Sequence, residues 1–414
     1  MSAIGALAGL ALAIFLIFKK LSPVYSLMLG ALVGGLIGGA GITGTVAMMS
    51  SGVGDVVSAV IRILAAGVLS GVLIETGAAD SISNVIVERL GQRHVYLSLA
   101  LATMLLTATG VFIDVAVITV APIALTLANR LRLSTSAILV MLIGGGKCGN
   151  IISPNPNTII AAENFGADLY STMACNIGAA VIGLLFTVYV IGRLVPKSAT
   201  GPAPQATAIA KDNPRFLPAI IGPITAVVLL ALRPIAGISI DPLIALPAGG
   251  VVGILCMGRL RTLGKSVTLG LSKMTPVAVL LIATGTIAGV IKGSTLTELI
   301  LSGVTYINLS DSLLAPIAGI VMSAATASTT AGAAIASSSF APAILSTGVG
   351  AAWGAAMVNA GSTVVDHLPH GSFFHATGGV AEMSVKQRMA LIPYESMIGL
   401  ALAALSTVTY LLFG

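Results

Sequence analysis

Hydrophobic runs long enough to cross a lipid bilayer recur along the whole chain, separated by short polar segments. A membrane-spanning helix needs roughly 17–25 mainly apolar residues, so the pattern predicts an all-α polytopic membrane protein in contact with the lipid bilayer throughout. The first run, residues 3–18, precedes Lys19 and Lys20 rather than following them. A secretory signal has the opposite order, and we therefore expect a retained first helix.

Composition agrees with this pattern. Hydrophobic residues make up 56% of the 414 positions, 8% are charged, and the mean hydropathy is +1.05. A soluble domain needs more polar surface. The net charge of +6 is small for this length and its basic residues lie in short loops, which argues against a nucleic-acid partner. The three cysteines have no metal-site spacing, so we expect neither metal nor haem among cofactors.

A polar stretch at residues 195–214 interrupts the hydrophobic pattern and predicts a cytoplasmic linker between an N-terminal half, 1–194, and a C-terminal half, 215–414. The halves resemble each other weakly. The sequence SPNPNT at 153–158 aligns with DHLPHG at 366–371, and Pro156 lies as far from Pro369 as Gly166 does from Gly379. Such matches in a shared order suggest an internal duplication.

Basic residues indicate that the two halves have opposite orientations. Residues 40–54 contain no Lys or Arg, whereas the equivalent part of the second half contains Arg259, Arg261, Lys265 and Lys273. The next loop reverses the bias, since Arg89 and Arg93 have no basic counterpart in residues 306–312. Cytoplasmic loops are enriched in Lys and Arg, so the pattern predicts two inverted repeats.

Placing Lys19 and Lys20 on the cytoplasmic side predicts five transmembrane helices and one re-entrant hairpin in each repeat. Both termini are then expected to be periplasmic. The first hairpin is expected at 95–129, with its turn at 107–110, and a broken helix at 134–169. The second hairpin is expected at 313–347, followed by a broken helix at 348–383.

The substrate site is expected where these breaks and hairpin tips meet. Two prolines prevent a helix through 153–158, and non-helical backbone at membrane depth survives only where protein or a water-filled cavity satisfies it. Helix N-termini exposed at such breaks attract anions. The candidate substrate-binding residues are Thr107, Thr109, Lys147, Asn150, Ser153, Asn155, Asn157, Thr158, Thr326, Ser328, Thr329, Thr330, Asn359 and Ser362.

Ionisable residues within membrane segments are functional candidates because their burial is costly. Asp114 could bind and release a proton, or could cap the hairpin turn. Lys147 could neutralise a substrate carboxylate, or could be the counter-ion of Asp114 or Glu163.

Three residues near the second break, Asp366, His367 and His370, could form a proton relay, or could line an aqueous mouth. Glu163 and Asp168 are expected near the outer end of a helix, with a capping or gating role.

At these residues the sequence resembles the gluconate permease (GntP) family of proton symporters, within the ion-transporter superfamily, over nearly the whole chain. The family's hairpin motif Phe-Phe-(Glu/Asp)-Val-Gly-Phe, followed by a proline, corresponds to VFIDVA at 111–116 with Pro122. The second hairpin tip, 324–330, is similar to the family's Thr/Ser/Gly-rich equivalent. Residues 166–169 and the stretch from Ser384 to Gly399 also match its motifs.

The resemblance implies proton-coupled symport of a small organic anion across the inner membrane. It also implies a homodimer whose hairpin-bearing transport domains move against a scaffold in an elevator-like mechanism. This chain departs from the family at two places that concern the substrate. Family members typically have Pro-Pro-His-Pro-Gly-Pro where this chain has SPNPNT, at 153–158, and His-Val-Asn-Asp-Ser-Gly where it has VVDHLP, at 364–369. The substrate could therefore be a sugar acid, a hydroxy acid or another carboxylate.

Two other transport functions stay open, namely sodium-coupled di- or tricarboxylate symport and sodium/proton antiport. An enzyme is not expected, because the sequence has no GxSxG or HExxH motif.

Overall fold

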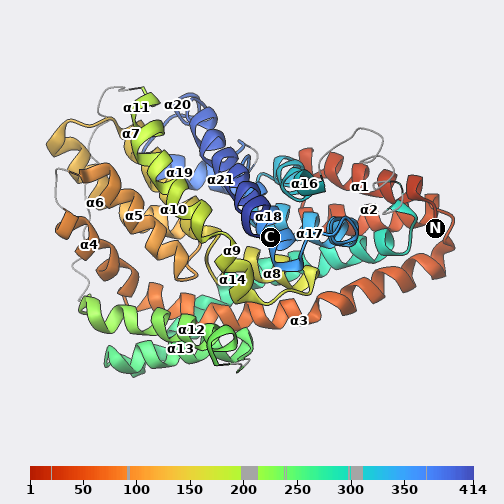
Figure 1. Cartoon of the computed structure of the whole chain (residues 1–414), viewed down its shortest axis with the longest axis horizontal. Helices are drawn as coiled ribbons and strands as arrows, with labels where there is room; N and C mark the ends of the chain where they lie inside the picture. Colours follow the sequence, from red (N-terminus) through yellow and green to blue (C-terminus); the bar gives the residue numbers. More distant parts are fainter. Residues whose placement is uncertain are drawn as a thin grey trace.

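The computed structural model describes residues 1–19, 21–90, 94–196, 213–236, 238, 240–296, 299, 311–369 and 371–414, and every regular element in them is a helix (Figure 1). The N-terminal half contains α1 (Ala3–Phe18), α2 (Pro23–Ile37), α3 (Gly41–Glu75), α4 (Ala78–Leu90), α5 (Val95–Ala108), α6 (Ile113–Leu131), α7 (Thr135–Asn150) and α8 (Pro156–Phe165). It ends with the helical series α9 (Leu169–Cys175), α10 (Ile177–Phe186), η2 (Thr187–Ile191) and α11 (Gly192–Leu194).

The C-terminal half begins with α12 (Phe216–Ala236), α13 (Pro242–Cys256), η3 (Leu260–Thr262) and the long helix α14 (Leu263–Lys292). The described part then continues with α16 (Asp311–Thr326), α17 (Thr329–Ser346), α18 (Ala351–Gly361), α19 (Ser372–Val380), α20 (Val385–Met389) and α21 (Ile392–Phe413).

Local sequence explains why the chain breaks and restarts around α8. Asn155 caps the helix by accepting a hydrogen bond from the Thr158 amide, and Pro156 supplies a first residue whose missing N–H is not needed there. Gly166 ends α8 with a φ of 65°, a left-handed conformation that favours glycine. Asp168 then caps α9 by accepting from two backbone amides. These signals produce two short helices instead of one long span.

The long helices α3 and α14 pack against each other in opposite directions. Glycines allow the close approach: a Cβ atom on Gly52 would lie 2.7 Å from the Gly289 Cα, and one on Gly71 would lie 2.8 Å from the Gly270 nitrogen. Small residues bring helix backbones together in this way in membranes, where the hydrophobic effect does little to hold helices together.

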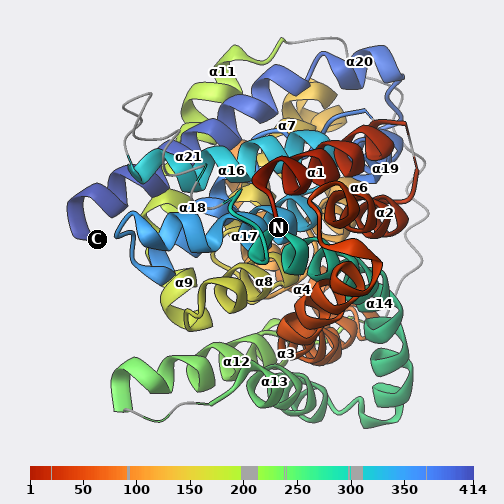
Figure 2. The ribbon, with the colours of Figure 1, turned by 90° about the vertical axis from the view of Figure 1, so that its right-hand side faces the viewer.

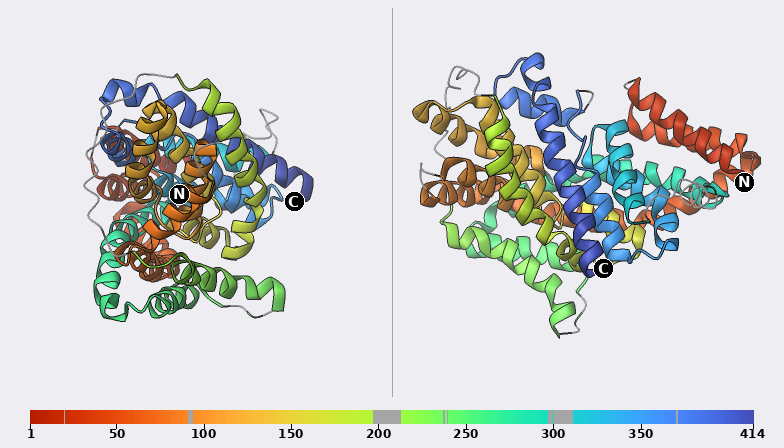
Figure 3. Two further views of the ribbon diagram at one scale, coloured as in Figure 1. Left: turned by 90° about the vertical axis from the view of Figure 1, so that its left-hand side faces the viewer. Right: turned by 45° about the horizontal axis from the view of Figure 1, so that its top comes forward.

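The remaining helices lie around this pair. The hairpin of α1 and α2 packs beside the N-terminal part of α3, at the end of the molecule opposite α4, α5 and α6 (Figure 3). The pair α12 and α13 forms a layer beside the C-terminal part of α3 (Figure 2). Buried apolar side chains form two clusters, one around α5 to α7 and one joining α1, α2 and α14 to α16, α17 and α18.

Four of the described helical stretches are long and apolar enough to cross a membrane: Gly41–Glu75, Leu169–Leu194, Leu260–Lys292 and Val385–Phe413. Several shorter apolar helices accompany them. The prediction that residues 40–54 form a loop is wrong, because α3 begins at Gly41. Lys265 and Lys273, also placed in a loop by the sequence, lie within α14. Residues 41–75 contain no proline that would stop a helix, and α3 runs through the small polar residues Thr43, Thr45, Ser50 and Ser51. Most of the predicted linker lies outside the described residues.

Candidate functional site

Four irregular segments meet near the centre of the molecule. The break between α7 and α8 lies beside the turn joining α5 to α6, since a Cβ atom on Gly110 would lie 3.8 Å from Pro154. The break between α18 and α19 lies beside the turn joining α16 to α17, where a Cβ atom on Gly371 would lie 2.7 Å from the Ala327 Cβ. Ala327 itself has a φ of 48°, a strained conformation for a residue other than glycine.

A buried cluster of charged side chains joins the two halves at this place. The Lys147 ammonium, at the C-terminal end of α7, contacts the Thr363 carbonyl, lies 2.6 Å from Asp366 Oδ1 and lies 3.0 Å from His367 Nδ1. The Lys147 and His367 side chains are fully buried and Asp366 is 3% exposed. The counter-ion of Lys147 is thus Asp366, and the alternatives Asp114 and Glu163 are wrong.

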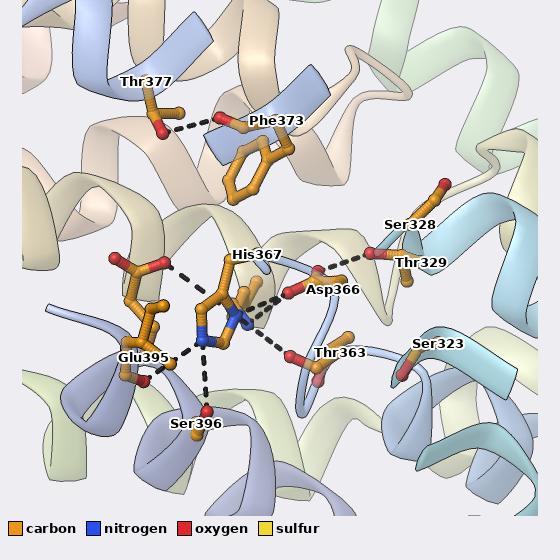
Figure 4. A network of polar contacts seen from close by, with 12 residues as sticks. Ser323, Ser328, Thr329, Thr363, Asp366, His367, Phe373, Thr377, Glu395 and Ser396 are labelled. Carbon is orange, nitrogen blue, oxygen red and sulfur yellow. Dashed lines mark hydrogen bonds and ion pairs between the residues drawn. The ribbon is translucent and has the colours of Figure 1, made fainter. Parts of the chain in front are cut away.

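The His367 ring is held from two sides (Figure 4). Its Nδ1 lies 2.9 Å from Asp366 Oδ1, and its Nε2 lies 3.1 Å from both the Ile392 carbonyl and the Ser396 hydroxyl of α21. A carbonyl oxygen can only accept a hydrogen bond, so Nε2 carries a hydrogen. An Nδ1 that accepts from Lys147 carries no hydrogen, whereas an Nδ1 that bonds to the Asp366 carboxylate, which can only accept, carries one.

The first two residues of α17 contact the break between α18 and α19 and the first turn of α8. Thr329 donates to Asp366 Oδ2 at 2.5 Å, on the side of that carboxylate away from His367 (Figure 4). Thr330 donates to Asn157 Oδ1 at 2.6 Å. The structure thus brings candidates from the two halves of the sequence into direct contact.

A second link between the breaks runs through amide side chains. Asn359 donates to the Thr158 hydroxyl at 3.0 Å, and Asn155 donates to the carbonyl and side-chain oxygens of Asn150. Two fully buried polar atoms, Ser153 Oγ and Asn359 Oδ1, have no hydrogen-bond partner among the described residues. An unpaired buried polar atom is costly, and no described residue offsets that cost for these two atoms.

Other predicted site residues bond to the backbone. Thr107 lies within α5, outside the turn, and donates to carbonyls that include Gly146, while Thr109, Thr326 and Ser362 donate to carbonyls of their own helices. Ser328 caps α17. These bonds shape the tips and breaks.

Asp114 lies in the first turn of α6, where its Oδ1 accepts from the Val115 amide at 2.9 Å. No hydrogen bond or ion pair joins it to Lys147, Asp366 or His367 in the part of the chain described. His370 lies outside the described residues.

Sequence reasoning missed a second buried ion pair beside this cluster. Arg388 forms a two-pronged pair with Glu395, and both side chains are 1% exposed or less. A glutamate in the first turn of an apolar helix was the available signal.

Arg62 was missed as well, although it lies within the apolar helix α3. It pairs with Glu163 of α8 and with Asp241, beside a cavity of about 290 Å³ that also borders Asp168. By donating to Asp241, in the connection between α12 and α13, the Arg62 guanidinium holds the pKa of that carboxyl below its usual range. Glu163 thus ties α8 to α3, and Asp168 has the capping role.

Known proteins resemble this chain over its full length. It matches the family described as GntP family permease over residues 1–413. An uncharacterized transporter of Haemophilus influenzae is 53% identical over 413 residues, which cover 100% of this chain and 99% of that protein. A high-affinity gluconate transporter of Escherichia coli is 23% identical over 395 residues, covering 89% and 90%.

The fold is similar to that of the YdaH transporter of Alcanivorax borkumensis, with a TM-score of 0.61 and 15% identity over 88% of this chain and 86% of the other. This likeness shows an all-helical transporter fold, and the full-length match shows the family. The chain therefore belongs to the GntP family of permeases, which are multi-pass membrane transporters and not enzymes.

Proposed function

We propose that this permease carries a small organic anion together with a proton across the inner membrane. The observation that carries the proposal is the buried cluster of Lys147, Asp366 and His367 between the two broken segments. A positive side chain suits an anionic substrate, and a histidine ring, which gains a second N–H group when it is protonated, suits a proton. Charges kept at such a cost inside a membrane protein are usually functional.

The substrate class follows from the polar groups around the cluster. Ser153 and Asn359 offer buried, unpartnered oxygens for hydroxyl groups of a substrate, and the N-termini of α8 and α17 offer backbone amides for a carboxylate. A gluconate transporter among the relatives supports a hydroxylated carboxylate. We therefore infer a sugar acid or another hydroxy acid.

Hydrogen-bond donors and acceptors indicate where the proton binds. The ammonium of Lys147 has three hydrogens and faces three acceptors, the Thr363 carbonyl, Asp366 Oδ1 and His367 Nδ1. With His367 neutral and its hydrogen on Nε2, Asp366 Oδ1 and His367 Nδ1 are both acceptors, and a proton added on Nδ1 joins the two atoms, which lie 2.9 Å apart, in a hydrogen bond. We place the transported proton between these atoms.

Proton binding then changes what Lys147 can do. With a hydrogen on His367 Nδ1, the ring no longer accepts from Lys147, and two N–H groups 3.0 Å apart repel each other. The flexible lysine is released from one of its three acceptors while the cluster gains one positive charge. A substrate carboxylate can take the vacated hydrogen bond and neutralise that charge, so proton binding and anion binding favour each other.

The proposed architecture is an inverted repeat working as an elevator in a homodimer. Supporting it, the order of helices from α12 to α21 parallels that from α1 to α11, with the long helices α3 and α14 antiparallel. In addition, α2 packs against α14 while α13 packs against α3, as a two-fold relation requires. The turns before α6 and α17 are then the tips of re-entrant hairpins.

Reconstituted uptake tests the proposal. Purified protein in proteoliposomes is given labelled gluconate, other sugar acids, hydroxy acids or dicarboxylates, under an imposed proton or sodium gradient. We expect an inward proton gradient to drive uptake of a hydroxylated acid without sodium. Sodium-driven uptake, or sodium/proton exchange without an organic substrate, would reject the proposal.

Variants locate the proton. Lys147→Met and His367→Gln are expected to lower proton-driven uptake at least about tenfold, the loss that 1.4 kcal/mol of binding energy gives. Lys292→Met, which removes an exposed lysine from an ion pair with Asp55, is the matched control. Asp114→Asn tests the other candidate: a loss confined to this variant would move the proton site to the first hairpin.

A further inference from the structure

The buried ion pair between Arg388 and Glu395 has no part in the scheme above. Arg388 Nη2 lies 3.0 Å from Glu395 Oε2, and Nη1 contacts Oε1. Nε and Nη2 also donate to the Thr377 hydroxyl, at 3.2 Å and 3.1 Å, and the Phe374 ring centroid lies 5.0 Å from the guanidinium carbon. Thr377 and Phe374 thus position the Arg388 guanidinium, which in turn holds the Glu395 carboxylate.

That carboxylate faces the proton site. Glu395 Oε2 lies 3.9 Å from His367 Nδ1, too far for a hydrogen bond and close enough for a strong electrostatic effect. The same first turn of α21 supplies Ile392 and Ser396, which bind the opposite edge of the ring. One short stretch therefore sets both the orientation of His367 and the charge beside it.

The charges around His367 come from four segments. Lys147 of α7 is positive, and Asp366 of the break and Glu395 of α21 are negative. Arg388 of α20 lies behind Glu395 and is bonded to it. In the neutral-histidine state these charges balance. A protonated ring would have two carboxylates facing Nδ1, of which Asp366 accepts the hydrogen bond and Glu395 adds attraction.

We propose that Glu395, held by Arg388, is a positioning residue that stabilises protonated His367 and thereby sets the pH range in which the transporter takes up its proton. The inference rests on the proposed proton symport at the same site. A buried ion pair is weak evidence of a contribution to stability, since apolar replacements of similar volume are often as stable. Its closeness to His367 gives the pair another role.

The test measures the pH dependence of initial uptake in proteoliposomes. Glu395→Gln removes the negative charge but leaves Arg388 buried and unpaired, which could prevent folding. The double variant Glu395→Gln with Arg388→Gln leaves no unpaired buried charge and is therefore measured beside it. We expect the pH midpoint to move to more acidic values by about one unit for Glu395→Gln, the usual effect of losing an adjacent opposite charge. The double variant should move it less, in the same direction, because Glu395 is nearer to His367 than Arg388 is.

Other readings distinguish positioning from a structural role. At the acidic plateau the KM for the substrate should stay within about twofold of wild type, a change below 0.5 kcal/mol. Arg388→Lys keeps the charge and should keep the wild-type midpoint. An unchanged midpoint in the folded double variant, or an equal loss of uptake at every pH, would overturn the inference. Absence of proton-driven uptake in the wild type would instead reject the proposed function.

Discussion

Removing one member of the Lys147 and Asp366 pair should destabilise the protein strongly, while removing both should cost much less. The two charges lie 2.6 Å apart and are almost completely buried. At an effective dielectric constant of about 20 their attraction is about 6 kcal/mol, most of which offsets the cost of taking both from water. Lys147→Met leaves a buried carboxylate without its cation, and such breaks cost about 3–5 kcal/mol.

A double-mutant cycle measures this coupling. Lys147→Met, Asp366→Asn and the combined variant are unfolded by denaturant in detergent micelles, followed by the fluorescence of Trp353, the one tryptophan of the chain. We expect a coupling energy of at least about 2 kcal/mol, at the upper end for contacting residues. The same cycle on the exposed pair Lys292 and Asp55, 3.0 Å apart, should give less than about 1 kcal/mol. Additive losses at the buried pair would refute the reasoning.

Three further expectations concern the packing around the site. Arg62 lowers the folded-state pKa of Asp241, so the contribution of Asp241 to stability is complete above the ordinary carboxyl range and is lost below it. Stability should therefore decline as pH falls below about 4. Asp241→Asn should weaken this acid dependence, measured by thermal unfolding. Gly166→Ala should cost about 1–2 kcal/mol in denaturant unfolding, because its φ is 65° while its Cβ would meet open space. Gly145→Val should reduce the yield of folded protein seen by gel filtration, since a Cβ there overlaps the Ala100 carbonyl and separates α5 from α7.

Much of the architecture could be read from local sequence. Apolar runs predicted a helical membrane protein, and the two prolines of 153–158 predicted the break before α8, where the structure shows Asn155 as the cap. These features depend on neighbouring residues alone, through the missing N–H of proline and the capping amide. Helix ends without such signals were less certain, as α3 shows by starting at Gly41.

The sequence by itself determined that the chain is a membrane protein whose hydrophobic pattern is interrupted by polar, proline-containing breaks, because hydropathy and proline act locally. Only the tertiary structure decided which charges meet. Lys147 and Asp366 are 219 positions apart, and no local pattern chooses Asp366 over Asp114 or Glu163 as partner. The same holds for Glu395, whose place beside His367 depends on how α21 packs against the break. Electrostatic pairing follows distance in space, which helix packing sets.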